Sequence, residues 1–176
     1  MNIFNTYFFY YIYYLLSGRK DSILISFFRK KGISIGDKCH IYSNILSPEP
    51  YLVTIKDEVT IAPGCRLITH DNSVCKLNIN STDVFGKIEI GNNCFIGANS
   101  MILPGVVISD NTIVAAGAVV TKSFPPNVVI GGNPARVITT IDKYRLKIAP
   151  YCLSVENLSF VEKKELILNS NQLITK

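Results

Sequence analysis

The sequence predicts an all-β solenoid, a parallel β-helix built from hexapeptides, with helices at its N-terminal and C-terminal ends. An aliphatic side chain recurs every six residues at Ile90, Ile96, Ile102, Ile108, Val114 and Val120. Compact residues stand two positions earlier, at Ile88, Cys94, Ser100, Val106, Thr112 and Ala118. A period of six fits neither a 3.6-residue helix nor the two-residue alternation of a strand. We therefore expect the aliphatic residues to point into the bore and to stack on their counterparts in neighbouring coils.

Composition favours one folded domain. The 176 residues are 48% hydrophobic and 18% charged, which argues against disorder. The net charge of +5 is not gathered into one basic run, so we expect a small anionic ligand and no nucleic acid. The five cysteines include no CxxC pair, and Cys39, Cys65 and Cys94 stand two residues before repeat aliphatic residues. We expect these three as buried thiols in a reducing, cytoplasmic protein.

Residues 1–32 are expected to form an N-terminal helical segment. An apolar, Tyr-rich run over residues 3–17 is followed by Arg19 and Lys20. This charge order argues against a signal peptide, and the run is shorter than the roughly 20 residues of a membrane span. The helix is expected to pack on its own or a neighbouring subunit. Alternatively, residues 1–20 contact a membrane surface, with Arg19, Lys20 and the cations at 29–31 facing anionic lipid. A second helix is expected over residues 23–31.

The β-helix is expected over residues 33–138. The aliphatic residues in phase before the main run are Ile35, Ile41, Ile55, Ile61 and Leu67. Residues 44–52 interrupt this series and contain two prolines, which cannot serve a sheet ladder, so this segment should bulge from the coil. The phase is lost again in a loop at residues 69–87, and a non-repetitive loop of this length is more often functional than decorative.

The segment after Val120 is rich in proline and glycine and is expected to end the coils. Residues 139–176 should form a helical cap on the open end of the solenoid. One helix is predicted over residues 141–148. The other is predicted from about Ser154, where Ser-Val-Glu-Asn precedes an apolar periodic run, to about Asn169.

The coils, the Thr-His-Asp sequence in the loop and the Gly-Gly-Asn-Pro-Ala-Arg-Val-Ile ending together resemble the left-handed β-helix acyltransferases. Within that family the chain is similar to the sugar O-acetyltransferases of bacterial capsule and lipopolysaccharide synthesis, and to maltose, galactoside and serine acetyltransferases. The resemblance spans residues 33–138. It implies a left-handed crossover, an exception to the usual rule, acetyl-CoA as co-substrate without a metal, and a homotrimer with active sites between subunits. It also implies a sugar or glycan acceptor. We expect the protein in the cytoplasm, or at the inner face of the membrane if residues 1–20 contact lipid.

Acetyl transfer to a hydroxyl needs a base for the hydroxyl proton, donors for the oxyanion and a slot for the thioester. The chain has two histidines. His70 opens the irregular loop and matches the family's base, the alternative being a loop histidine bonded to backbone. His40 is expected on the surface. Glu49 in the bulge or Asp71 beside the base could orient the imidazole, although Asp71 could equally cap the backbone of its own loop.

For coenzyme A, the resemblance carries over to Gly97, Ala98, Ala116, Gly117, Thr121, Lys122 and Arg136. The first four match positions along the pantetheine arm, and the Ala98 amide is a candidate oxyanion donor. The last three match positions near the adenine and phosphates, where cations meet anionic oxygens, or else they are solvated surface. Asn44 and Asn72 are the expected acceptor contacts.

The expected function is acetyl transfer from acetyl-CoA to a sugar hydroxyl in bacterial surface polysaccharide synthesis, by direct attack with His70 as general base. The alternatives are N-acetylation of a nucleotide-linked amino sugar and a non-catalytic β-helix that binds a partner. A hexapeptide-type carbonic anhydrase would need three metal-binding histidines, and this chain has two.

Overall fold

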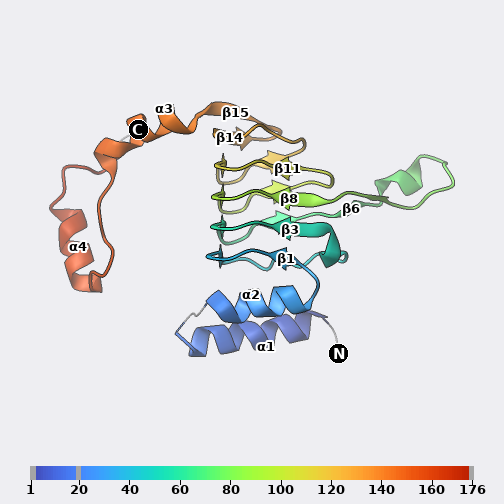
Figure 1. Ribbon diagram of the computed structural model, residues 1–176, viewed down its shortest axis with the longest axis horizontal. Helices are drawn as coiled ribbons and strands as arrows, with labels where there is room; N and C mark the ends of the chain where they lie inside the picture. The colour runs from blue at the N-terminus through green and yellow to red at the C-terminus, as the bar shows by residue number, and fades with distance from the viewer. Residues whose placement is uncertain (1–2, 19–20, 175–176) are drawn as a thin grey trace. The chain divides into compact units, whose positions relative to one another are not determined.

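A computed structural model describes residues 3–18 and 21–174 of the chain. The chain divides into two compact units, Met1–Ile141 and Asp142–Lys176. The first unit contains stacked coils with a pair of helices at their N-terminal end (Figure 1). The second unit is helical.

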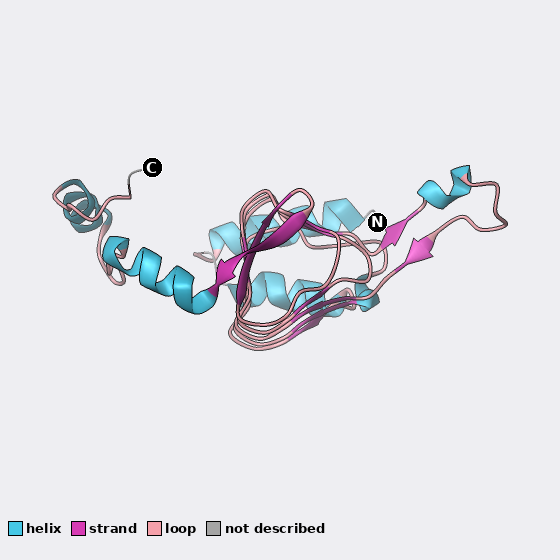
Figure 2. Ribbon diagram, turned by 90° about the horizontal axis from the view of Figure 1, so that it is seen from above, coloured by secondary structure: helices cyan, strands magenta, loops and turns pink. Residues whose placement is uncertain are grey.

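Three sheets of short strands form the sides of the coils, which superimpose when viewed along the stack (Figure 2). The first sheet contains β1 (Ser34–Ile35), β3 (Val53–Ile55), β8 (Ile88–Ile90) and β11 (Val107–Ile108). The second contains β5 (Arg66–Leu67), β10 (Met101–Ile102) and β13 (Val119–Val120). The third contains β2 (His40–Ile41), β4 (Thr60–Ile61), β9 (Phe95–Ile96), β12 (Ile113–Val114), β14 (Val128–Gly132) and β15 (Ala135–Thr140). All pairings in the three sheets are parallel except that between β14 and β15.

The pairing register confirms the predicted stacking of the aliphatic residues. Ile90 lies opposite Ile108, and Ile102 lies opposite Val120, so three six-residue repeats complete one coil. All six aliphatic residues of the main run are fully buried. Cys39, Cys65 and Cys94 are buried free thiols, as expected. Because each coil places its inward side chain on the one below, the hydrophobic core runs the length of the stack.

The second of the two N-terminal helices packs on the first coil of its own chain, and the first helix packs on the second (Figure 1). α1 spans Ile3–Leu16 and α2 spans Asp21–Lys30, close to the predicted ranges. Phe27 and Phe28 of α2 are buried, and the rings of Tyr10 and Phe27 lie 4.6 Å apart between centroids. Arg19 and Lys20, which we expected to meet lipid, lie outside the described residues. None of the described helices is long and apolar enough to span a membrane.

The loop at residues 69–87 forms an arm that extends away from the stack (Figure 1). Its two sides are β6 (His70–Asp71) and β7 (Val84–Phe85), which pair antiparallel, and a short 3₁₀ helix, η2 (Ser73–Lys76), follows β6. The bulge at residues 44–52 ends in another 3₁₀ helix, η1 (Pro50–Leu52). The arm and the bulge are the two departures from the repeat that the loss of phase indicated.

The segment after Val120 adds one more partial coil before it ends the stack. Ile108 bridges to Phe124, and β12 pairs with β14 so that Val114 lies opposite Ile130. The stack therefore continues through one more partial coil before β15 turns back along β14. These partners are sixteen residues apart instead of the eighteen that separate Ile90 from Ile108, and this shorter turn broke the six-residue phase.

The second unit contains most of α3 (Ile141–Ile148), the short η3 (Ala149–Tyr151) and α4 (Phe160–Leu168). The bounds of α3 match the prediction. The predicted start of α4 near Ser154 was wrong, because the cap is Ser159. The Ser159 hydroxyl accepts a hydrogen bond from the Glu162 amide while the Glu162 carboxylate accepts one from the Ser159 amide, a complete capping box. Asn157, with φ of +61°, lies in the left-handed region and cannot continue a helix from Ser154.

Candidate active site

A pocket of about 290 Å³ lies where the arm leaves the coil beside the bulge. Its lining residues are Asn44, Leu46, Ser47, Pro48, Arg66, Leu67, Ile68, Thr69 and His70. The bulge supplies the first four, and the chain running from β5 into β6 supplies the rest. The pocket therefore depends on both departures from the repeat.

His70 and Glu49 meet at this pocket. The Nδ1 of His70 lies 2.9 Å from Oε2 of Glu49, and the hydroxyl of Thr69 donates to the same oxygen at 2.6 Å. The side chain of Glu49 is 15% exposed, and Thr69 is buried. A carboxylate only accepts hydrogen bonds, so this contact places a hydrogen on Nδ1, and in the neutral imidazole the lone pair is then on Nε2. The arrangement thus presents an imidazole that can take up a proton.

The charge of Glu49 is stabilised by these two donors. Burial acts to raise the pKa of Glu49, but the hydrogen bonds from Thr69 and His70 outweigh it, and the pKa lies below its ordinary value. Glu49 is therefore ionised at neutral pH. An ionised carboxylate at Nδ1 also stabilises the imidazolium that forms when Nε2 takes a proton.

The arm also contacts the imidazole. His70 lies opposite Phe85 in the β6–β7 pairing, and their ring centroids are 5.9 Å apart. The backbone of Gly86 donates to the carbonyl of Thr69 at 2.9 Å. The base therefore contacts the bulge through Glu49 and the arm through Phe85.

Asp71 contacts its own loop. Its Oδ1 accepts a hydrogen bond from the backbone amide of Ser73 at 2.8 Å, and the donors at Ser73 lower the pKa of this exposed carboxyl. This is the backbone-capping role that the sequence left open for Asp71. The carboxylate in contact with the imidazole is that of Glu49.

The two candidate acceptor residues differ in position. Asn44 lines the pocket, and its side-chain oxygen accepts a hydrogen bond from the Leu46 amide at 3.2 Å. Asn72 is exposed on the arm just before η2 and is not among the residues that line the pocket.

The candidate pantetheine residues lie at another corner of the coils. Gly97 and Ala98 follow β9, and Ala116 and Gly117 follow β12 in the next coil, where the Gly117 amide donates to the Ala98 carbonyl at 2.8 Å. The backbones approach closely here, since a Cβ added at Gly97 would lie 2.5 Å from the Ala116 nitrogen. Within the described part of the chain, the amides of Ala98 and Ala116 have no acceptor, so both can donate to a ligand.

The three candidate phosphate residues are exposed near the end of the stack. Thr121 and Lys122 follow β13, and the Lys122 ammonium lies 5.7 Å from the centre of the Phe124 ring. Arg136 on β15 donates to the carbonyl of Ala135 at 2.8 Å. All three positions can accept an anion from solvent.

Within one chain, the base and the pantetheine candidates stand at opposite ends of the strands of the second sheet. The corner of Ala98 precedes β10 of that sheet, and His70 follows β5 of the same sheet. The structure therefore brings together His70, Glu49 and Asn44, and it keeps the four pantetheine candidates at a separate corner. Thr121 and Lys122 follow β13, so they lie along the same edge of the second sheet as His70.

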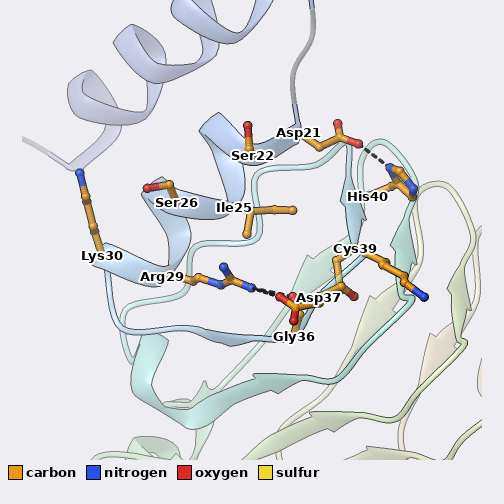
Figure 3. Close-up of a pocket in the computed structure, with 11 residues that line it drawn as sticks. Asp21, Ser22, Ile25, Ser26, Arg29, Lys30, Gly36, Asp37, Cys39 and His40 are labelled. Atoms are coloured by element: carbon orange, nitrogen blue, oxygen red, sulfur yellow. Dashed lines mark hydrogen bonds and ion pairs between the residues drawn. The ribbon is translucent and has the colours of Figure 1, made fainter.

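A second pocket, of about 500 Å³, lies between α2 and the first coil (Figure 3). His40 is exposed there, contacts the carboxylate of Asp21 and stacks on Tyr42. Arg29 donates to the carbonyls of Ile35 and Gly36 at 2.9 and 2.7 Å. These groups join α2 to the first coil, and Arg29, expected to face lipid, is held in this joint.

Sequence reasoning missed four residues around the base: Ser47, Arg66, Thr69 and Phe85. Arg66 precedes the inward-facing Leu67, so the repeat phase could have placed it on the outer face of the coil that leads to His70. The other three depend on the courses of the bulge and the arm, for which the repeat gives no signal. In the described residues, no cluster of three or more His, Cys, Asp or Glu side chains is placed to hold a metal ion.

Comparison with known proteins agrees with this architecture. The family model described as the hexapeptide repeat of succinyl-transferase matches residues 87–122. Protein CapG of Staphylococcus aureus is 44% identical over 146 residues, covering 80% of this chain and 85% of CapG. A maltose O-acetyltransferase structure from Clostridium difficile 630 has a TM-score of 0.57 and 30% identity, covering 68% of this chain and 75% of its own. A hexapeptide-repeat acetyltransferase from Vibrio cholerae, solved with acetyl-coenzyme A, has a TM-score of 0.56 and 33% identity, covering 62% of this chain and 61% of its own.

The similarity to CapG extends over most of both chains, and the two solved acetyltransferases share the stacked coils. The resemblance found in the sequence is therefore confirmed. This chain belongs to the hexapeptide-repeat acyltransferase family.

Proposed function

We propose that this acetyl-CoA-dependent acetyltransferase transfers its acetyl group to a hydroxyl of a sugar acceptor, with His70 as general base. The observation that carries the proposal is the hydrogen bond between His70 and Glu49 beside the pocket. The bond fixes the imidazole with Nε2 available, as a base for an alcohol requires. The solved relatives include an enzyme named for maltose and one that holds acetyl-coenzyme A.

In the proposed reaction, Nε2 of His70 takes the proton of the acceptor hydroxyl as its oxygen attacks the thioester carbonyl. The new C–O bond forms, and the free amide of Ala98 or Ala116 donates to the oxyanion of the tetrahedral intermediate. Collapse breaks the C–S bond, and the imidazolium returns its proton to the departing thiolate, so the products are an acetyl ester and the thiol of coenzyme A. The transfer is direct, without an acyl-enzyme.

We further propose that the active enzyme is a homotrimer. In a single chain, the base and the pantetheine candidates lie at opposite ends of the strands of one sheet. A neighbouring chain can bring its Ala98 corner to the His70 pocket, which would complete the site between subunits. The left-handed sense of the coils is part of this proposal, as the family resemblance implies.

The setting we propose is bacterial surface polysaccharide synthesis in the cytoplasm, at the membrane face. All five cysteines are free, which suits a reducing compartment. The outer face of α1 exposes Phe8, Phe9, Tyr13 and Leu16, and α1 contains no charged residue. Because aromatic and aliphatic side chains on one helix face suit the membrane interface, we propose that α1 rests on the lipid surface.

The His70→Ala variant tests the proposed chemistry. Turnover of acetyl-CoA with a hydroxyl acceptor should fall by about 10²- to 10⁴-fold, since a positioned base contributes that much. His40→Ala is the matched control, because it removes the other imidazole away from the pocket. Thiol release measures turnover, and light scattering should give the mass of three chains for both variants.

Two results would contradict the proposal. Near-wild-type turnover of the His70→Ala trimer would show that His70 is not the base. A monomeric enzyme with full activity would show that the site is not shared between subunits. Matched amino sugars should be poor acceptors. If they are acetylated in preference to the hydroxyl sugars, N-acetylation is the correct function.

A further inference from the structure

We propose that the pocket beside His70 selects an acidic sugar, whose carboxylate or phosphate pairs with Arg66 while a ring hydroxyl bonds the hydroxyl of Ser47. This inference rests on the proposed function and adds the chemical class of the acceptor. Two observations carry it: an unpaired guanidinium and an unsatisfied buried hydroxyl, both in the wall of the same pocket.

Arg66 is positioned by the coil. Its neighbour Leu67 points into the core, so Arg66 points outward, and the Arg66 amide donates to the carbonyl of Ser100 at 3.0 Å. The backbone of this residue is therefore fixed by the sheet. Its side chain lines the pocket that also contains His70.

The guanidinium of Arg66 has no hydrogen-bond or ion-pair partner among the described residues. The other described arginines all have one: Arg29 and Arg145 contact Asp37 and Asp142, and Arg136 bonds a carbonyl. A guanidinium presents a planar fork of donors that matches a carboxylate or a phosphate. Arg66 is thus a free anion receptor beside the proposed base.

The Ser47 hydroxyl is the one buried side-chain polar atom of the described residues that lacks a hydrogen-bond partner. Leaving such a group unsatisfied is costly, and native proteins rarely do so without a reason. A hydroxyl both donates and accepts, so it complements a sugar hydroxyl, and rotation about one bond suffices to redirect it. Its position in the pocket wall makes a bound acceptor the natural partner.

The lining of the pocket offers an anion one cation and otherwise neutral polar groups. Arg66 carries the one permanent charge among the residues that line it, and Asn44, Ser47 and Thr69 are neutral. The ionised Glu49 is not part of the lining, and its Oε2 accepts hydrogen bonds from Thr69 and His70. The volume of about 290 Å³ lies at the small end of ligand pockets, about 300–1,000 Å³, which suits one sugar unit with its acidic group.

The test uses matched acceptors on the full-length enzyme: hexopyranosides in neutral, 6-carboxylate and phosphorylated forms. Thiol release gives kcat/KM for each, and saturation-transfer NMR gives binding of the same compounds. We expect one acidic form to exceed its neutral counterpart by at least about tenfold in kcat/KM. Comparing the carboxylate and phosphate forms tells which acidic group is recognised. The preference should weaken as ionic strength rises.

Arg66→Gln should abolish this preference by lowering kcat/KM for the acidic acceptor to the level of the neutral one, while the KM for acetyl-CoA stays unchanged. Ser47→Ala should raise KM for both acceptors. Arg145→Gln, in the second unit, is the matched control and should change neither value.

Equal use and equal binding of acidic and neutral sugars would overturn the inference. So would an Arg66→Gln variant that loses affinity for acetyl-CoA, which would assign Arg66 to the cofactor, or one that loses its trimers. The proposed function fails separately, through an active His70→Ala variant. An inactive His70→Ala variant combined with an indifferent Arg66→Gln variant would remove only the acidic-sugar assignment.

Discussion

One oxygen of Glu49 accepts hydrogen bonds from both Thr69 and His70. The hydroxyl of Thr69 donates to Glu49, so we expect Thr69 to act as a positioning residue through that carboxylate. Thr69→Val keeps the shape of the side chain and removes the donor. We expect kcat to fall roughly tenfold with little change in the KM for acetyl-CoA, because a hydrogen bond to a charged group is worth about 1.5–3 kcal/mol. Thr69→Ser, which keeps the hydroxyl, should recover most of the loss.

Thr69→Val should also change how the free energy of unfolding depends on pH. The folded pKa of Glu49 is lowered, so its ionisation stabilises the fold above the ordinary value of 4.5, and this contribution is lost as pH falls through the lower folded pKa. The gap in unfolding free energy between wild type and Thr69→Val should therefore be full at neutral pH and narrow below about pH 4.5. Denaturant titrations across pH measure it, and a gap independent of pH would show that Thr69 does not act on the ionised carboxylate.

At the scale of the elements, close contact between coil corners makes a second prediction. A Cβ added at Gly91 would lie 2.7 Å from the Asp110 nitrogen and 2.9 Å from the Ser109 carbonyl carbon, both in the next coil. Gly91→Ala must therefore push two coils apart, and we expect a loss of roughly 1–3 kcal/mol or more in unfolding free energy.

Gly105 provides the matched control for Gly91. Its φ is +81°, and a Cβ there would meet nothing within 4 Å. Asn93 and Asn111 adopt left-handed conformations at other turns, with φ of 53° and 54°. Gly105→Asn should consequently stay within about 1 kcal/mol of wild type, since asparagine tolerates this region. Thermal unfolding compares the two variants, and equal effects would contradict the contact argument.

The coils were predictable because every inward side chain must meet its counterpart in the next coil, which imposes the six-residue period on the sequence. The six-residue period did not reveal the partial coil ending at Ile130, because its turn is shorter than that of the regular coils. The start of α4 was missed because two serines could cap it, and only Ser159 has the glutamate that completes the box. The hydrophobic period cannot tell which of two nearby serines caps a helix.

The residues of the candidate site were likewise predictable only in part. His70 and Glu49 were identifiable as residues at the two breaks of the repeat, and the structure brings them together. Ser47 and Arg66 were not singled out, because their importance comes from a shared pocket wall that depends on how the bulge folds back on the coil. The sequence pattern specifies the regular coil and carries little information on the path of an insertion.

At the scale of the molecule, the N-terminal end of the stack presents an apolar face. Tyr10 and Tyr14 turn toward the chain, whereas Phe9 and Leu16 on the opposite side of α1 are 65% and 81% exposed. The cations Lys30 and Lys31 follow at the end of α2, and Asp21 at its start is engaged by His40. Figure 1 shows α1 as the outermost element at this end. The 14 residues of α1 are too short to span a bilayer of about 30 Å, so the helix would lie along the surface.

Flotation with vesicles rich in phosphatidylglycerol tests this placement. Wild type should rise with the vesicles, and added salt should weaken the association if Lys30 and Lys31 meet anionic headgroups in the proposed placement. The double variant Phe9→Glu, Leu16→Glu should stay with the soluble fraction, since it puts two charges on the lipid-facing side. Leu146→Glu, at an exposed apolar position of α3, is the control and should float like wild type. If the α1 variant floats as well, or wild type does not, α1 does not contact lipid. A double variant that instead changes the mass of the assembly would show that the face joins copies of the chain.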